Sequence, residues 1–447
     1  MKKTEKFAWS AIAVVIFTGI GKVMGYVRAS LIAYYFGADN LTDAYTAANS
    51  ATSILSQILT LAIATTFIPV LAKVSEKEGL KGKNSHTSNM INISLLIGGA
   101  FAAIGIVFAP VLGKIVAGGF SAETFEMTVV LIRISMVSVI FSGVVGVLTG
   151  YLQSEGKFAA AGSIVIPVNL VYILYLVFMS KSFGLKGLAV STTVGIIAQI
   201  LFMVPAFRNT KFKYNRSLDI TNKYVIQTLI LSVPVLISTG LDNINTLVDT
   251  RLASGLAEGT ITLMNNANKL NLLIYGVFTM AIVQVVYPGL SEAFSAGDYD
   301  GGRKGTIFSA KIISLITIPA TVGLIVLAKP VVEIAFMRGA FNESDAFITA
   351  QTLKCYSVGL WALSINYLLN RVYYSLQDTK TPLFIAAITT VVNVVLKLVL
   401  VGKFQHAGLA LAFALATNIA VLVSFSLLRK KLKYLGGRDF LITAIKS

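Results

Sequence analysis

The stretch that decides the fold is GKVMGYVRASLIAYYFGADNLTD, residues 21–43. It continues a long apolar run, yet it carries Lys22 and Arg28, two cations six residues apart. An ionised side chain at the centre of a membrane-spanning helix costs roughly 2.5–3.5 kcal/mol on insertion scales. Because this cost arises twice within one helix, we expect both cations to face an internal cavity and to bind an anion there.

The composition is that of a polytopic membrane protein. Of the 447 residues, 55% are hydrophobic and 13% are charged, whereas soluble domains carry about 25% charged residues. Apolar runs longer than about 18 residues recur along the chain, which predicts membrane-spanning segments. These runs are continuous rather than alternating, so the predicted fold class is all-α.

We expect about twelve spanning helices. The opening MKKTEKFAWSAIAVVIFTGI has the charge order of a signal peptide, but it continues without a small-residue cleavage site and predicts a retained helix. The final GGRDFLITAIKS looks like the start of a thirteenth helix. The predicted spans are 7–36, 43–72, 89–113, 124–153, 159–180, 186–207, 223–253, 260–290, 306–327, 345–374, 382–402 and 407–428.

The two halves of the chain repeat, which predicts two lobes of six helices. At an offset of 219 residues the matches include Asn49 with Asn268, Thr60 with Thr279, and Pro69 with Pro288. An even number of helices inserts both copies the same way up, so the pseudo-symmetry axis follows the membrane normal and a central cavity lies between the lobes. The predicted parts are an N-terminal lobe at 1–207, a cytoplasmic linker at 208–222, a C-terminal lobe at 223–430 and a tail or further helix at 431–447.

The basic residues predict the orientation. In the predicted loops and tails, 21 lysines and arginines fall on one side of the membrane and 6 on the other. Cytoplasmic loops carry the excess of basic residues, so both termini are expected in the cytoplasm of a bacterial inner membrane. This bias accounts for most of the net charge of +17, which therefore does not indicate a nucleic-acid partner.

The sequence contains no pattern typical of an enzyme or a metal site. The single cysteine, Cys355, excludes an internal disulfide and a cysteine-ligated metal, while His86 and His406 fall in predicted loops. The run GIGKVMG at 19–25 has the wrong spacing for a dinucleotide loop and follows no strand. We expect neither catalysis nor a bound cofactor.

Lys22, Arg28 and Lys269 are the predicted cavity residues. Lys269 lies in the predicted helix 260–290, the repeat counterpart of 43–72, so cations from both halves would line the cavity. Guanidinium and ammonium groups suit a phosphate ligand. The other cations in spans are expected to reach the membrane surface or pair with acids: Arg133, Arg251, Lys311, Lys354, Arg371 and Lys397.

At this point the chain resembles the MurJ (MviN) lipid II flippases of the MOP exporter superfamily. The opening carries a basic Lys22, a Gly25-Tyr26-Val27-Arg28 step, a Phe36-Gly37-Ala38 turn and Asp43-Ala44-Tyr45. Further matching stretches are VDTRLASGLAEGTITLMNNANKL at 248–270, RGAF at 338–341, YSVGL at 356–360 and YYSLQDTKTP at 373–382. This chain departs from the family pattern at Ala29, where the family usually has an acid, and at 51–57, where neutral residues replace a basic step.

The resemblance implies a flippase that moves an undecaprenyl-pyrophosphate-linked peptidoglycan precursor to the outer leaflet by alternating access. It implies pyrophosphate contacts at Lys22, Arg28 and Lys269, with Asp43 at the outer end of the second helix. Two alternatives remain open: a flippase for another lipid-linked polysaccharide (capsule, exopolysaccharide or teichoic), and a cation-coupled multidrug antiporter. A purely structural membrane scaffold is a fourth hypothesis.

No nucleotide-binding pattern is present, so the energy for net transport is expected from an ion gradient or the membrane potential. Na⁺ or H⁺ would be the coupling ion. The acids to test for a cation site are Asp242, Asp249 and Asp378, with a salt bridge as the alternative role. The expected partners are the lipid-linked substrate and membrane lipid, and a monomer is expected.

Overall fold

The computed structural model describes residues 3–208 and 210–432, so the expected thirteenth helix and the tail beyond residue 432 lie outside the described residues. Within the described ranges every regular element is a helix, and eight helices are long and apolar enough to cross a membrane. The all-α class is thereby confirmed. Two compact units divide the chain, the first unit at Met1–Gly255 and the second unit at Leu256–Ser447.

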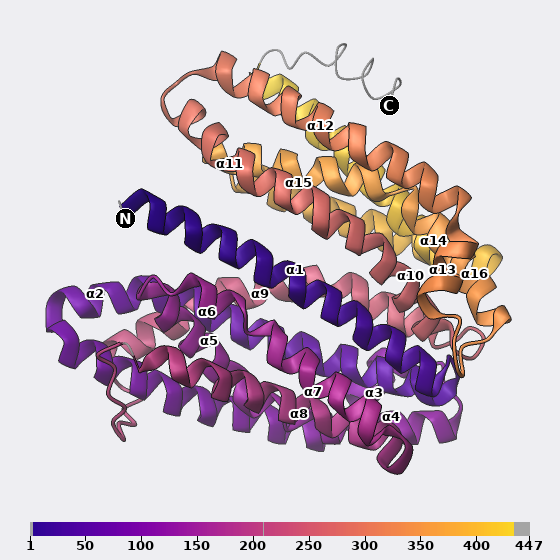
Figure 1. The fold of residues 1–447 in the computed structure, drawn as a ribbon, viewed down its shortest axis with the longest axis horizontal. Coiled ribbons are helices and arrows are strands. Elements are labelled where there is room, and N and C mark those ends of the chain that lie inside the picture. The colour runs from indigo at the N-terminus through magenta and orange to yellow at the C-terminus, as the bar shows by residue number, and fades with distance from the viewer. Residues whose placement is uncertain (1–2, 209, 433–447) are drawn as a thin grey trace. The chain divides into compact units, whose positions relative to one another are not determined.

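The first unit contains nine helices among its described residues, and α7 and α8 lie side by side within it (Figure 1). The helices are α1 (Lys3–Phe36), α2 (Asn40–Val107), α3 (Ala109–Ala117), α4 (Ala122–Met136), α5 (Val139–Ser154), α6 (Phe158–Gly162), α7 (Val165–Phe178), α8 (Ser180–Phe207) and α9 (Lys223–Ala253).

Helix α2 joins two predicted spans without a loop. The polar stretch 73–88 between them is rich in Lys and Glu, which are good helix formers, and it continues the helix. The chain changes direction at Gly79, whose φ of 63° is accessible to glycine at little cost. His86, predicted in a loop, is therefore helical and buried, and its ring stacks on Phe67 at 5.5 Å between centroids.

Helix α9 belongs to the first unit, which differs from the predicted lobe boundary at 208–222. It packs along α2, where the hydroxyls of Thr66 and Ser232 lie 2.8 Å apart. At its other end the Ser254 hydroxyl accepts a hydrogen bond from the Gly119 backbone N–H at 3.0 Å. These contacts at both ends of α9 explain why the compact unit extends to Gly255.

The predicted linker is bound to helix α2 by side chains. We call residues 210–222 the strap. The Asn89 side chain donates to the Asp219 carbonyl and accepts from the Asp219 N–H, both at 2.8 Å. Asn84 and Asn92 donate to carbonyls elsewhere in the strap at 3.0 and 2.7 Å. Because these asparagines share one face of α2, they satisfy the strap's backbone without a sheet or a helix.

The second unit is a helical bundle around its own apolar core. Leu368, Val372 and Tyr373 of one helix are fully buried in this core, and α11, α12 and α15 run alongside one another (Figure 1). The elements are α10 (Thr260–Ile274), the π-helix η1 (Tyr275–Thr279), α11 (Met280–Ser295), α12 (Tyr299–Val326), α13 (Ala328–Phe336), α14 (Glu343–Ser357), α15 (Leu360–Ser375) and α16 (Lys380–Leu432).

Helix α16 likewise joins the predicted spans 382–402 and 407–428. It reverses at Gln405, where φ is 48°, so its two arms end near each other. The joined spans in α2 and α16, together with the break between α14 and α15 in the predicted span 345–374, contribute to the difference between the twelve predicted spans and the eight long apolar helices of the described residues.

Two threonines at matching positions of the predicted repeat, Thr60 and Thr279, each form a hydrogen bond to another helix of their own unit. In the first unit the Thr60 hydroxyl donates to the Ser142 carbonyl at 2.8 Å. In the second unit the hydroxyl of Thr279, the repeat partner of Thr60, lies 2.8 Å from the Ser364 hydroxyl. Each unit thus joins two helices by a threonine at the matching position.

Candidate functional site

Helix α1 approaches α7 closely because its facing residues are small. A Cβ at Gly21 would lie 3.2 Å from the Val165 side chain, and the Asn169 amide donates to the Gly21 carbonyl at 3.3 Å. Ala29 and Ala33 follow at helical spacing and are almost fully buried. Ala29, where the family pattern has an acid, is therefore a packing residue on α1.

Arg28 is held against an aromatic ring. Its guanidinium carbon lies 4.6 Å from the centroid of the Tyr172 ring on α7. The Tyr172 hydroxyl in turn lies 2.7 Å from the Thr192 hydroxyl on α8. A guanidinium over a ring face gains about 0.5–2 kcal/mol, depending on its exposure. The three residues therefore connect α1, α7 and α8 and orient the cation.

Arg28 lines a cavity of about 740 Å³ inside the first unit, which we call the polar cavity. Its volume is in the range of sites that enclose drug-sized ligands. Most of its walls come from α2, α5, α7 and α8. The polar residues that line it are Arg28, Asn49, Ser53, Ser56, Gln57, Thr60, Thr65, Ser142, Thr149, Gln153, Tyr172, Thr192, Gln199 and Thr239.

The polar cavity is neutral apart from its arginine. Arg28 is the only charged residue among the described residues that line it, and amides and hydroxyls supply the other polar groups. Ser53, Gln57 and Thr60 belong to one face of α2, in the region where the family's basic step is replaced. This cavity lies within the first unit, so the predicted cation-lined cavity between the lobes stays a prediction.

Sequence reasoning missed most of this wall. Tyr172 is one aromatic residue in an apolar span, and no sequence signal separates it from a packing residue. The signal that existed was the spacing of Asn49, Ser53, Gln57 and Thr60, polar residues that recur every three or four positions within a span. Such a stripe predicts one polar helix face.

The other predicted cavity residues lie elsewhere. Lys22 is partly buried in α1, and neither it nor Asp43 is among the residues that line the polar cavity. Asp43 is buried in the first turn of α2, next to a capping box made by Asp39 and Thr42. Lys269 lies on α10 of the second unit and is exposed.

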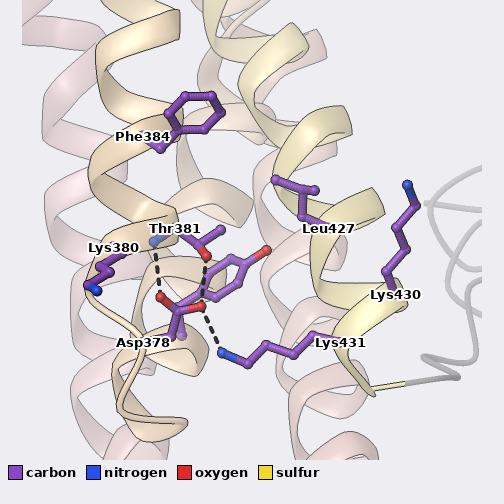
Figure 2. Close-up of a pocket in the computed structure, with 8 residues that line it drawn as sticks. Asp378, Lys380, Thr381, Phe384, Leu427, Lys430 and Lys431 are labelled. Atoms are coloured by element: carbon purple, nitrogen blue, oxygen red, sulfur yellow. Dashed lines mark hydrogen bonds and ion pairs between the residues drawn. The ribbon is translucent and has the colours of Figure 1, made fainter.

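The candidate coupling acids have different settings. The side chain of Asp242 lies outside the described residues, and Asp249 is partly buried on α9. Asp378 follows α15, where it accepts from the Lys431 ammonium at 2.7 Å and from the backbone N–H and hydroxyl of Thr381 at 3.0 and 2.7 Å (Figure 2). Within the described ranges no group of three His, Cys, Asp or Glu suits a metal ion.

The ion pair keeps Asp378 charged. Partial burial raises the pKa of a carboxyl group, but here the hydrogen bonds from Lys431 and Thr381 outweigh burial and lower the pKa of Asp378 to about 2. Both carboxylate oxygens are occupied by donors. This environment favours the salt-bridge role that the sequence left as an alternative.

Two further cations of the predicted spans, Lys397 and Arg371, have different surroundings. Lys397 is fully buried on α16. The Arg371 guanidinium carbon lies 5.4, 5.1 and 5.9 Å from the ring centroids of Tyr287, Tyr367 and Tyr374. As with Arg28, aromatic rings lie close to the guanidinium group of this arginine.

The long apolar helices and the polar cavity define the chain as a polytopic membrane transporter. It belongs to the MurJ family, because the family profile described as "Lipid II flippase MurJ" matches residues 32–447. The probable lipid II flippase MurJ of Vibrio cholerae is 29% identical over 433 residues, covering 94% of this chain and 82% of the relative. That of Rickettsia prowazekii is 27% identical over 436 residues, covering 96% and 85%.

Solved structures agree. A lipid II flippase MurJ in an inward closed conformation superposes with a TM-score of 0.82 at 26% identity, covering 97% of this chain and 90% of that one. An inward-facing MATE multidrug transporter of the MOP superfamily gives a TM-score of 0.77 at 15% identity, covering 92% and 94%. The latter supports the superfamily fold alone.

Proposed function

We propose that this protein is a flippase that moves lipid II, the undecaprenyl-pyrophosphate-linked peptidoglycan precursor, from the inner to the outer leaflet. The observation that carries the proposal is Arg28, the one cation among the described residues that line the polar cavity, in a chain that matches the MurJ family over most of its length. Arg28 binds the pyrophosphate, and the amides and hydroxyls around it bind the sugar and peptide. The protein acts as a transporter, without covalent chemistry.

The transport cycle follows alternating access, with both termini in the cytoplasm. Lys22 on α1 and Lys269 on α10 contact the pyrophosphate at other stages of the cycle, and Asp43 stabilises the outer end of α2. A sodium or proton gradient, acting at Asp242 or Asp249, biases the direction. The protein works as a monomer in the inner membrane.

The antiporter alternative finds less support. A cavity that exports cationic drugs needs acids, and the described residues that line the polar cavity include no Asp or Glu. The neutral face of α2 keeps a second candidate open, a flippase for another undecaprenyl-pyrophosphate glycan. Such a substrate shares the pyrophosphate and differs in the sugars.

Depletion of the protein in a peptidoglycan-making cell tests the proposal. Lipid II should accumulate in the inner leaflet, and the Lys22→Ala, Arg28→Ala double variant should insert normally but fail to restore growth. The control is Lys77→Ala with Lys304→Ala, which removes the same charge from exposed positions. Accumulation of a different lipid-linked glycan would transfer the proposal to the second candidate, and normal rescue by the double variant would refute the role of these cations.

A further inference from the structure

A second pocket lies where the two arms of α16 end, entirely within the second unit. It has a volume of about 650 Å³, and Lys380, Lys430 and Lys431 line it together with Asp378. We call it the lysine pocket. Since it is formed by residues 373–384 and 427–431, it shares no residue with the polar cavity.

The lysine pocket carries excess positive charge. Lys431 and Asp378 form an ion pair at 2.7 Å and neutralise each other. Lys380 and Lys430 are exposed on the two rims of the pocket, and neither points toward Asp378 (Figure 2). Within residues 3–208 and 210–432 neither of them forms an ion pair. Two ammonium groups therefore remain for an anion.

One side of the pocket is apolar. Phe384 also lines it, one helical turn beyond Lys380, and 62% of its surface is exposed. Leu427 lines the opposite arm, one turn before Lys431. A small soluble anion such as phosphate would not contact these side chains favourably. A lipid with an anionic head and acyl chains would satisfy both the lysines and the apolar wall.

The location also fits a lipid. Asp378 and Lys431 stand at the ends of spanning segments, and the bias of basic residues assigns this end to the cytoplasmic side. Anionic headgroups concentrate in the cytoplasmic leaflet, and basic pockets between spanning helices on that side bind lipid phosphates.

We propose that the lysine pocket binds the phosphate of an anionic phospholipid of the inner leaflet, with Phe384 against an acyl chain. The exposed side chains of Lys380 and Lys430, which point outward from the two rims in Figure 2, turn inward to bind the phosphate. The Asp378–Lys431 pair holds the two arms of α16 at the distance that the headgroup requires. This site is separate from the substrate site, so it stands or falls independently of the transported glycan.

Native mass spectrometry of the full chain tests the proposal by titration with phosphatidylglycerol and with phosphatidylcholine of the same acyl chains. Each lysine near a membrane surface contributes about a fivefold factor, so Lys380→Gln with Lys430→Gln should weaken phosphatidylglycerol binding about 30-fold. Lys77→Gln with Lys304→Gln, which removes equal charge from exposed positions, should change it less than about twofold. Both variants keep the Asp378–Lys431 pair, and unchanged melting temperatures would establish that they fold.

Two further measurements identify the ligand. Phe384→Ala should weaken phosphatidylglycerol binding roughly fivefold through lost apolar contact, and inorganic phosphate should fail to displace the lipid. Equal affinity for the two lipids, equal loss in the control variant, or displacement by inorganic phosphate would overturn the proposal. Binding of undecaprenyl pyrophosphate without binding of phosphatidylglycerol would also overturn the proposal.

Discussion

The polar cavity and the lysine pocket accommodate charge in opposite ways. The polar cavity holds a single guanidinium, stacked on Tyr172 among neutral amides and hydroxyls. The lysine pocket is lined by three lysines and one aspartate, and Lys431 forms an ion pair with the carboxylate of Asp378. The first lies among spanning helices, where each ion costs several kcal/mol, and the second lies at helix ends, where water and headgroups solvate ions. Position along the helix, rather than the number of basic residues available, therefore limits how many charges a site carries.

Substitution of Arg28, the one cation among the described residues that line the polar cavity, should have the largest effect on transport. Arg28→Ala should lower lipid II transport about 100-fold, because hydrogen bonds to a charged group contribute about 1.5–3 kcal/mol each. Transport is measured by the outer-leaflet accessibility of lipid II in cells that contain only the variant. Arg28→Lys keeps the charge but lacks the forked guanidinium donors. Its transport rate should lie between those of the unchanged protein and Arg28→Ala. Transport at the normal rate by Arg28→Ala would contradict a pyrophosphate role.

Substitution of Tyr172, whose ring lies against Arg28, should have the next largest effect on transport. Tyr172→Leu removes the aromatic face and should lower transport about tenfold, because a partly desolvated cation–π contact contributes roughly 1–2 kcal/mol. Tyr172→Phe is its matched control. It keeps the ring, loses the hydroxyl's hydrogen bonds with Thr192, at 2.7 Å, and with Tyr45, and should lower transport less than about threefold. Equal losses in the two variants would show that the hydroxyl, and not the ring, positions Arg28.

Each uncharged polar residue that lines the polar cavity should contribute less to transport than Arg28 or Tyr172 does. Gln57→Leu removes one amide from the polar cavity and should lower transport roughly fivefold, the value of about one hydrogen bond. Gln351→Leu makes the same change at an exposed position of α14 and should have no effect. If Gln57→Leu transports normally, the α2 face does not contact the substrate.

The Asp378–Lys431 pair gives the smallest expected effect, and this effect depends on pH. Asp378→Asn should lower the free energy of unfolding by about 1 kcal/mol at neutral pH, because Lys431 is partly exposed and its ion pair is weakened by solvent. The folded pKa of Asp378 is about 2, below the ordinary 3.8, so the contribution is present above pH 4 and is lost as the pH falls toward 2. The melting temperatures of the unchanged protein and Asp378→Asn should therefore converge as the pH falls from 4 to 2. A constant difference in melting temperature down to pH 2 would show that the ion pair is not its cause.

Much of the fold could be predicted because lipid imposes simple rules. The all-α class follows from continuous apolar runs, and the predicted span at 223–253 matches α9 residue for residue. The joined helices α2 and α16 could not be predicted, since a polar stretch such as 73–88 can form either a loop or a helix. The unit boundary at Gly255 depends on tertiary contacts of α9, which leave no local pattern in the sequence.

The candidate site was predicted through its cation, while the polar stripe on α2 was a second signal that the prediction did not use. Arg28 was identifiable because an arginine inside a span has a large cost. Lys22 shares that cost but does not line the polar cavity, since position on the helix circumference, and not type alone, decides which wall a residue joins. Amides and tyrosines carry no comparable cost, so Gln57 and Tyr172 did not stand out.

The strap has a consequence for the order of assembly during synthesis. Its partners on α2, such as Asn89, precede Asp219 by 130 residues, so they have left the ribosome before the strap is made. The strap can close on α2 before any residue of α10 is translated. Helix α9 then emerges beside a completed surface of α2, and the first unit can finish folding while the second unit is still being inserted.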